Sequence, residues 1–142
     1  MNVPRFALRA APAILFALGA ASCSSSPASS MNQPPPPLSN DIMIPDGGST
    51  MTTGAFSPNP KTVALAGGAS VAVRFVNDDI NTSTYGGTGV THHIVSDDGG
   101  ITFDAGTIAP YHTMTVNLTA AGTIPFHCMI HPSMVGSITV NP

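Results

Sequence analysis

Short runs of alternating apolar and polar residues recur through the chain from about residue 60 onward. The clearest run spans residues 70–77, where Val71, Val73 and Phe75 fall on one face of an extended strand. Clusters of glycine, asparagine, aspartate and proline separate the runs. Regularly spaced strands between such turn signals predict an all-β sandwich. The other expected strands are residues 62–65, 92–96, 113–118, 122–128 and 136–140.

The first 22 residues have the pattern of an export signal. Arg5 and Arg9 precede an apolar run over residues 10–21, which is too short for the roughly 20 residues of a transmembrane helix. The run ends in Ala20-Ala21-Ser22-Cys23, which resembles the lipobox of bacterial lipoproteins, although Ala20 stands where an aliphatic residue is usual. The resemblance implies a lipidated Cys23 that attaches the protein to a membrane. The alternative is a plain signal peptide cut near Ala21 or Ser22.

Two further segments complete the predicted organisation. Residues 23–40 are rich in serine and proline and have no apolar period, which indicates a linker that holds a domain away from a surface. Residues 41–142 are long enough for one core and form the expected domain. Residues 41–56 are a candidate first strand of unpredicted pairing, and the polar, glycine-rich residues 78–90 are a loop without an assigned role.

Charge limits the class of partner. Only 8% of the residues are charged, and after the leader Lys61 and Arg74 stand against seven aspartates. A nucleic-acid-binding protein needs clustered basic residues to neutralise phosphate, so we expect no nucleic-acid partner. We expect the mildly acidic domain to be a monomer.

The densest chemistry in the chain is the stretch Cys128-Met129-Ile130-His131-Pro132-Ser133-Met134, which has the pattern C-x-x-H-x-x-M. A second source of imidazole, His92-His93, lies in a separate expected strand. A thiolate suits copper or zinc, and one Cys, two His and one Met are the ligand set of a blue-copper site. The alternative for Cys128 is a disulfide with Cys23.

These residues occur in motifs that resemble the plastocyanin and amicyanin branch of the cupredoxins. The family's final ligand loop, Y-x-C-x-x-H-x-x-M-x-G, is matched by residues 126–136, with Phe126 in place of the tyrosine. Its upstream H-x-V-x-S-D-D-G motif is matched by residues 92–99, and residues 103–110 resemble its F-D-S-G-x-L-x-P segment. The resemblance runs from about residue 52 to residue 140 and implies a cupredoxin-like Greek-key β-sandwich.

Carried over by position, the copper ligands that the resemblance implies are His92, Cys128, His131 and Met134. His92 is preferred over His93 because it stands four positions before Ser96, and the pleat of a strand turns His93 to the opposite face. We expect His127 to point away from the site, His112 to be exposed and Phe126 to lie in the core. Met129 is a rival to Met134 as the thioether ligand.

The function that follows from the resemblance is one-electron transfer through a single type 1 copper ion, without catalysis. Redox protein partners are expected to dock near His131, and the leader implies export to the periplasm or cell envelope. The alternative is a copper-binding or copper-delivery protein of the envelope. A multicopper enzyme is not expected, because five histidines cannot supply further copper sites. A zinc hydrolase of the H-E-x-x-H type is not expected, because the sequence contains no glutamate.

Overall fold

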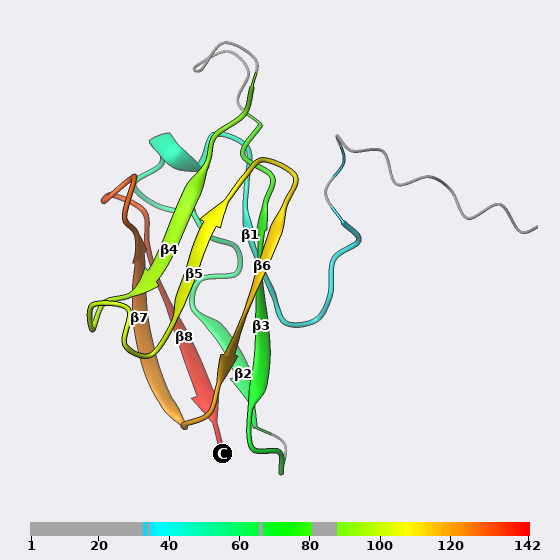
Figure 1. The fold of residues 1–142 in the computed structure, drawn as a ribbon, viewed down its shortest axis with the longest axis vertical. Helices are drawn as coiled ribbons and strands as arrows, with labels where there is room; N and C mark the ends of the chain where they lie inside the picture. Colours follow the sequence, from blue (N-terminus) through cyan, green and yellow to red (C-terminus); the bar gives the residue numbers. More distant parts are fainter. Residues whose placement is uncertain (1–32, 34, 66, 81–87) are drawn as a thin grey trace, which may run out of the picture.

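The computed structural model describes residue 33 and residues 35–65, 67–80 and 88–142. The predicted leader, Cys23 and most of the predicted linker lie outside these residues. The described part of the chain forms eight strands and one 3-10 turn, η1 (Gly48–Thr50) (Figure 1). The strands are β1 (Asp41–Ile44), β2 (Lys61–Ala64), β3 (Val71–Asn77), β4 (His92–Ser96), β5 (Asp104–Ile108), β6 (Thr113–Leu118), β7 (Gly122–Cys128) and β8 (Val135–Asn141).

The strands are arranged in two sheets that face each other. One sheet has three strands in the order β1-β3-β6, and the other has five in the order β2-β8-β7-β4-β5. The pairs β1–β3 and β2–β8 are parallel, and the remaining neighbours are antiparallel. This arrangement confirms the predicted all-β sandwich.

The core lies between the sheets and follows from the alternation seen in the sequence. Along β3, Val71, Val73 and Phe75 are buried, whereas Ala72 between them is exposed. Four phenylalanine rings meet at the centre of the core. Phe126 packs edge-on against Phe56 and Phe75, with ring centroids 4.8 Å and 5.4 Å away, and Phe103 lies beside both Phe75 and Phe126. Aromatic contacts of this kind stabilise a core beyond the burial of area alone. The prediction that Phe126 lies in the core is confirmed.

All six runs predicted as strands are strands. Of the other two strands, β1 was a candidate without a predicted partner, and β5 was not predicted. β1 lies within the candidate segment 41–56 and pairs in parallel with β3, a partner that local pattern cannot reveal. β5 contains Gly106 with a φ of 70°, and the β4–β5 register shifts between Ile94 and Val95. This irregularity removes the clean alternation on which strand prediction depends.

The residues just before β1 lie against the domain. The Arg74 guanidinium donates hydrogen bonds to both carboxylate oxygens of Asp41 and to the carbonyl of Pro36, 2.8 Å away. The Lys61 ammonium donates to the carbonyl of Ser39. The end of the predicted linker is thus held by side chains of β2 and β3. Among the described residues, no helix is long and apolar enough to cross a membrane.

Candidate metal centre

Two neighbouring strands bring the predicted ligands together. β4 and β7 are antiparallel, and Ile94 lies opposite Cys128. Because the strands run in opposite directions, His92 at the start of β4 and Cys128 at the end of β7 lie at the same end of the five-stranded sheet. The loop that follows Cys128 carries His131 and Met134 before β8 begins.

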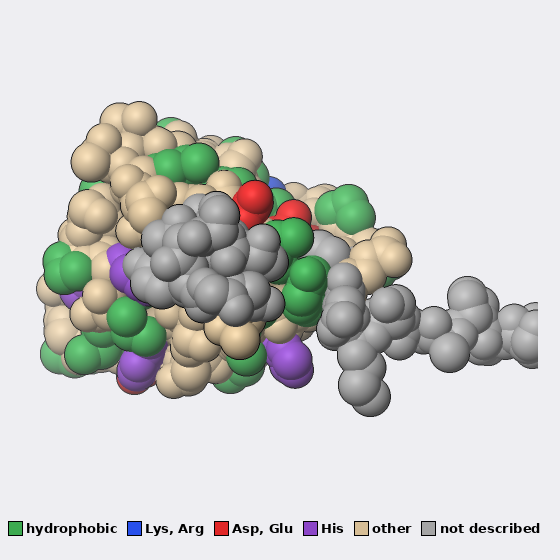
Figure 2. All heavy atoms as spheres, turned by 90° about the horizontal axis from the view of Figure 1, so that it is seen from above, with side chains coloured by type: hydrophobic (Ala, Val, Ile, Leu, Met, Phe, Trp, Pro, Cys, Tyr) green, Lys and Arg blue, Asp and Glu red, His purple; other side chains and the backbone are tan. Residues whose placement is uncertain are grey.

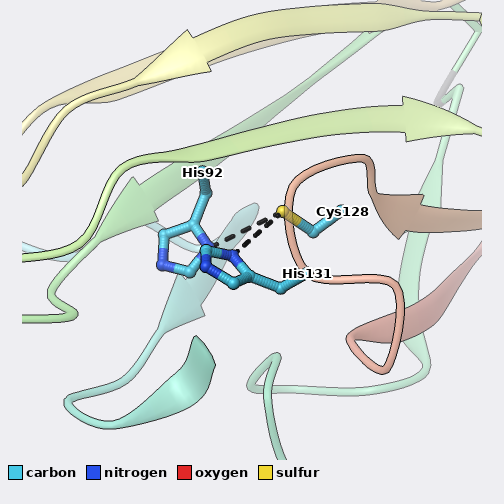
Figure 3. A group of neighbouring side chains, drawn as sticks. All are labelled: His92, Cys128 and His131. Atoms are coloured by element: carbon cyan, nitrogen blue, oxygen red, sulfur yellow. Dashed lines mark hydrogen bonds between the residues drawn. The ribbon is translucent and has the colours of Figure 1, made fainter. Parts of the chain in front are cut away.

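The sulfur of Cys128 lies between two imidazole nitrogens. Its Sγ is 3.7 Å from Nδ1 of His92 and 3.6 Å from Nδ1 of His131 (Figure 3). The three atoms lie within 4.8 Å of one another, so one ion can contact all of them. Cys128 and His92 are fully buried, and His131 is half-buried at the surface end of the group. It is the one such His, Cys, Asp or Glu group in the described part of the chain.

The ligand loop is closed by its own backbone. The N–H of Cys128 donates to the carbonyl of Met134 at 3.0 Å, and the N–H of Met134 donates to the carbonyl of His131 at 2.9 Å. The N–H of Met129 donates to the carbonyl of His93 on β4, which ties the loop to the neighbouring strand. The side chain of Met134 is fully buried, whereas that of Met129 is exposed. The role of Met134 as a ligand stays a prediction.

Both imidazoles of the group favour the neutral form. Burial lowers the pKa of His92 to about 4, a shift that the Asp79 carboxylate opposes and the ring of His131 increases. Burial also lowers the pKa of His131, again against the attraction of Asp79. A neutral imidazole has a lone pair for a metal, so neither ring needs to lose a proton at neutral pH.

Sequence reasoning missed Asp79, which contacts His92 from the side opposite to Cys128. Its Oδ2 lies 3.1 Å from Nε2 of His92, and both side chains are fully buried. Burial raises the pKa of Asp79. The backbone N–H and the side chain of Ser49, the N–H of Gly47 and the His92 ring lower it by more, so the net shift is downward. Asp79 lies in the polar segment that follows β3, where no spacing or motif distinguishes it from Asp78.

The other three histidines have partners outside the group. On the outer face of the sheet, His93 pairs with Asp104 at 2.8 Å and His127 pairs with Asp97 at 2.6 Å. His112 is exposed and bonds the carbonyl of Pro110. The predictions that His93 faces the opposite side from His92, that His127 points away from the site and that His112 is exposed are confirmed.

The S-D-D-G motif begins at Ser96, the last residue of β4, and forms the turn that leads to β5. The hydroxyl of Ser96 bonds the backbone of Phe103 and the carboxylate of Asp98. Asp98 in turn accepts hydrogen bonds from Thr102. Gly99 has a φ of 79°, in the left-handed region that favours glycine. The motif therefore fixes the turn at the end of β4 opposite to His92.

The donor set suits a soft or borderline metal ion. One thiolate and two neutral imidazoles in a mostly buried group match the trigonal His2Cys arrangement of blue-copper sites, and zinc also accepts these ligands. The residues present therefore fit a copper ion.

No protein-family model matches the sequence, and no curated protein matches it. Solved structures do. A purple cupredoxin from Nitrosopumilus maritimus matches with a TM-score of 0.56 and 24% identity over 71% of this chain and 98% of that chain. A reduced amicyanin variant matches with a TM-score of 0.50 and 16% identity over 71% of this chain and 80% of that chain.

An enzyme also has this fold as part of its chain. A copper-containing nitrite reductase from Thermus scotoductus SA-01 matches with a TM-score of 0.53 and 24% identity. The match covers 75% of this chain but 23% of the reductase. Together, the three likenesses show that this chain has the cupredoxin fold, which confirms the predicted fold class.

Proposed function

We propose that the protein is an electron carrier with one type 1 copper ion. The observation that carries the proposal is the convergence of the Cys128 sulfur and the Nδ1 atoms of His92 and His131, at one end of a cupredoxin-fold sandwich. When bound there, copper supplies a one-electron couple between Cu(I) and Cu(II). Both oxidation states accept a mixed set of soft sulfur and imidazole ligands.

Each residue has a distinct part in this proposal. Cys128 provides the thiolate, from a strand end where the backbone N–H is already bonded to Met134. His92 and His131 provide neutral Nδ1 donors. Met134, buried at the close of the loop, provides a weak fourth ligand. Because β4, β7 and the closed loop hold these groups before a metal arrives, little rearrangement is needed between the two oxidation states.

The surface around His131 suits transient docking of a redox protein. Three apolar side chains of the ligand loop and the start of β8 are more than half exposed: Met129 at 57%, Ile130 at 51% and Val135 at 55%. Figure 2 views this end of the molecule and shows hydrophobic side chains gathered on its left side near histidine. We call Met129, Ile130 and Val135 the apolar rim. Small contacts of this kind suit weak electron-transfer encounters.

The positions and hydrogen-bond partners of the other three histidines favour electron transfer over catalysis. A second copper centre of the kind an enzyme needs would require further imidazoles. His93, His112 and His127 are instead bonded to Asp104, Pro110 and Asp97, at positions that do not converge with one another or with Cys128 in the described structure. The leader pattern supports export to the periplasm or cell envelope, with a lipidated Cys23 as the attachment.

Voltammetry of the copper-loaded protein tests the function. We expect one copper per chain, a reversible one-electron wave and an intense visible band that disappears on reduction and returns on oxidation. Cys128→Ser keeps a small polar side chain but lacks the sulfur, so it should lose the band. A parent protein that binds copper without colour and without a reversible wave would favour copper delivery. Binding of zinc in strong preference to copper would contradict both readings.

A further inference from the structure

Asp79 is a carboxylate in a place where carboxylates are rare. Its side chain is fully buried, and burying an unpaired carboxylate costs several kcal/mol. The two basic side chains of the described residues do not offset this cost, since Arg74 bonds Asp41 and Pro36 and Lys61 bonds Ser39. Asp79 is therefore stabilised by hydrogen bonds to other groups.

Those hydrogen bonds are shared between a backbone turn and one imidazole. Oδ1 accepts from the N–H of Gly47 at 2.9 Å, and Oδ2 accepts from the N–H of Ser49 at 2.8 Å. The remaining contact of Oδ2 is with Nε2 of His92 at 3.1 Å. Asp79 thus joins the turn at η1 to a predicted metal ligand on β4.

The backbone around Asp79 leaves the carboxylate little freedom to move. Its N–H donates to Oδ1 of Asn77, and its carbonyl accepts from the N–H of Val90. The amide of Asn77 in turn donates to the carbonyls of Val90 and Ile108 at 2.7 Å and 2.9 Å. The carboxylate is held by a network of buried hydrogen bonds that reaches β3, β5 and the residue two before His92.

This contact determines which nitrogen of His92 is available. A carboxylate accepts hydrogen bonds and does not donate them, so the imidazole proton lies on Nε2. The lone pair is then on Nδ1, the atom that faces Cys128 at 3.7 Å. His131 has no carboxylate partner among the described residues.

We propose, on the basis of the proposed function, that Asp79 is the positioning residue of the metal centre. It orients the His92 ring, holds its proton on Nε2 and makes its Nδ1 a stronger donor. A carboxylate hydrogen-bonded to a ligand imidazole raises the basicity of that ligand, and its loss typically costs 10–100-fold in metal affinity. The added negative charge stabilises Cu(II) more than Cu(I), and so lowers the reduction potential.

The first test needs no metal. Nitrogen NMR of the histidine rings in the metal-free parent protein should show His92 as a single neutral tautomer with its proton on Nε2. Asp79→Ala should give exchange between tautomers or ring orientations at His92, while the signals of His93 and His127 stay unchanged. A parent His92 that is protonated on Nδ1, or that already exchanges between tautomers, would overturn the proposal even if every variant failed to fold.

The second test uses copper. Asp79→Asn should lower the ratio of Cu(II) affinity to Cu(I) affinity about tenfold, which raises the potential by about 59 mV for a one-electron couple. Asp41→Asn is the matched control: it removes one buried, hydrogen-bonded carboxylate of the other sheet and should leave the potential unchanged. If Asp79 had a purely structural role, Asp79→Asn and Asp41→Asn would both lower the melting temperature and neither would change the reduction potential. That result would overturn the proposal.

The two tests separate this proposal from the function on which it rests. A parent protein without a visible copper band would refute the electron-carrier function, while the NMR result would still decide whether Asp79 positions His92. A parent with the band, together with an Asp79→Asn variant of unchanged potential and unchanged His92 tautomer, would refute the role of Asp79 alone.

Discussion

Gly136 lies directly across from Phe126 in the β7–β8 pair, and the ring of Phe126 fills the space that a side chain would need. A Cβ placed on Gly136 would stand 2.4 Å from Cζ of Phe126. The ring cannot move aside cheaply, because Phe56 and Phe75 pack against it. The ring of Phe126 therefore requires glycine at position 136, which lies two residues after the buried Met134.

Gly136→Ala should destabilise the protein by about 1–3 kcal/mol, the usual cost of overpacking a core. Chemical denaturation of the parent and the variant measures the loss. Phe126→Leu in the same chain should relieve the clash, so that the two substitutions together cost less than the sum of the single losses. Additive losses would contradict the proposed clash.

Met134→Leu replaces the buried thioether with a side chain of similar volume. The metal-free variant should lose less than about 1.5 kcal/mol of stability, as is usual for this exchange in a core. If Met134 is the fourth ligand, loss of its sulfur should destabilise Cu(II) and raise the reduction potential, by about 59 mV for each tenfold change in relative affinity. Met129→Leu is the control for the rival thioether. A shifted potential in Met129→Leu but not in Met134→Leu would reverse the assignment.

The Asp41–Arg74 pair should make the stability of the folded protein depend on pH in the acidic range. Burial raises the pKa of Asp41, whereas the hydrogen bonds from Arg74 and from the N–H of Leu38 lower it by more. The pKa of Asp41 in the folded protein is therefore below its ordinary value of 3.8. Because the folded pKa is depressed, the pair's contribution is fully present above the unfolded pKa of about 3.8 and is lost as the pH falls through the folded pKa.

Thermal melts of the parent and Asp41→Asn between pH 6 and pH 2 measure this effect. The parent should be more stable by about 1–3 kcal/mol at pH 6, as expected for a hydrogen bond to a charged group. The difference should shrink below pH 3.8. A difference that stays constant down to pH 2 would show that the charge of Asp41 does not contribute.

The apolar rim should govern electron exchange between two copies of the protein. Ile130→Lys places like charges opposite each other when the same face of two molecules meets, which slows encounter by about tenfold. Line broadening in NMR spectra of mixed oxidised and reduced protein measures the exchange rate. Ile101→Lys is the matched control, since Ile101 is exposed in the loop after β4, at the opposite end of the sheet. Equal slowing by both variants would contradict docking at the rim.

Local pattern was sufficient for six of the eight strands, and the resemblance to the family's motifs supplied the candidate ligands. The alternation of Val71, Val73 and Phe75 reports directly which face is buried, and the spacing of Cys128 and His131 places both in one short loop. The choice of His92 over His93 rested on its place four positions before Ser96 and on the two-residue period of a strand, and the burial of His92 agrees with it.

Long-range contacts account for what the sequence did not reveal. The pairing of β1 with β3 joins Asp41 to Arg74, 33 positions apart, without a local signal. Asp79 is significant because the fold brings the turn at Gly47 and the ring of His92 to the same carboxylate. Neither relationship has a periodicity or a motif, so only the assembled sandwich makes it visible.

The bond between copper and the thiolate of Cys128 is tested most directly by the visible and electron paramagnetic resonance spectra of the Cu(II)-loaded protein. An intense thiolate-to-copper charge-transfer band with narrow copper hyperfine splitting is the predicted result. A colourless Cu(II) protein with ordinary hyperfine splitting would contradict it, since the sulfur that lies between His92 and His131 would then not be a ligand.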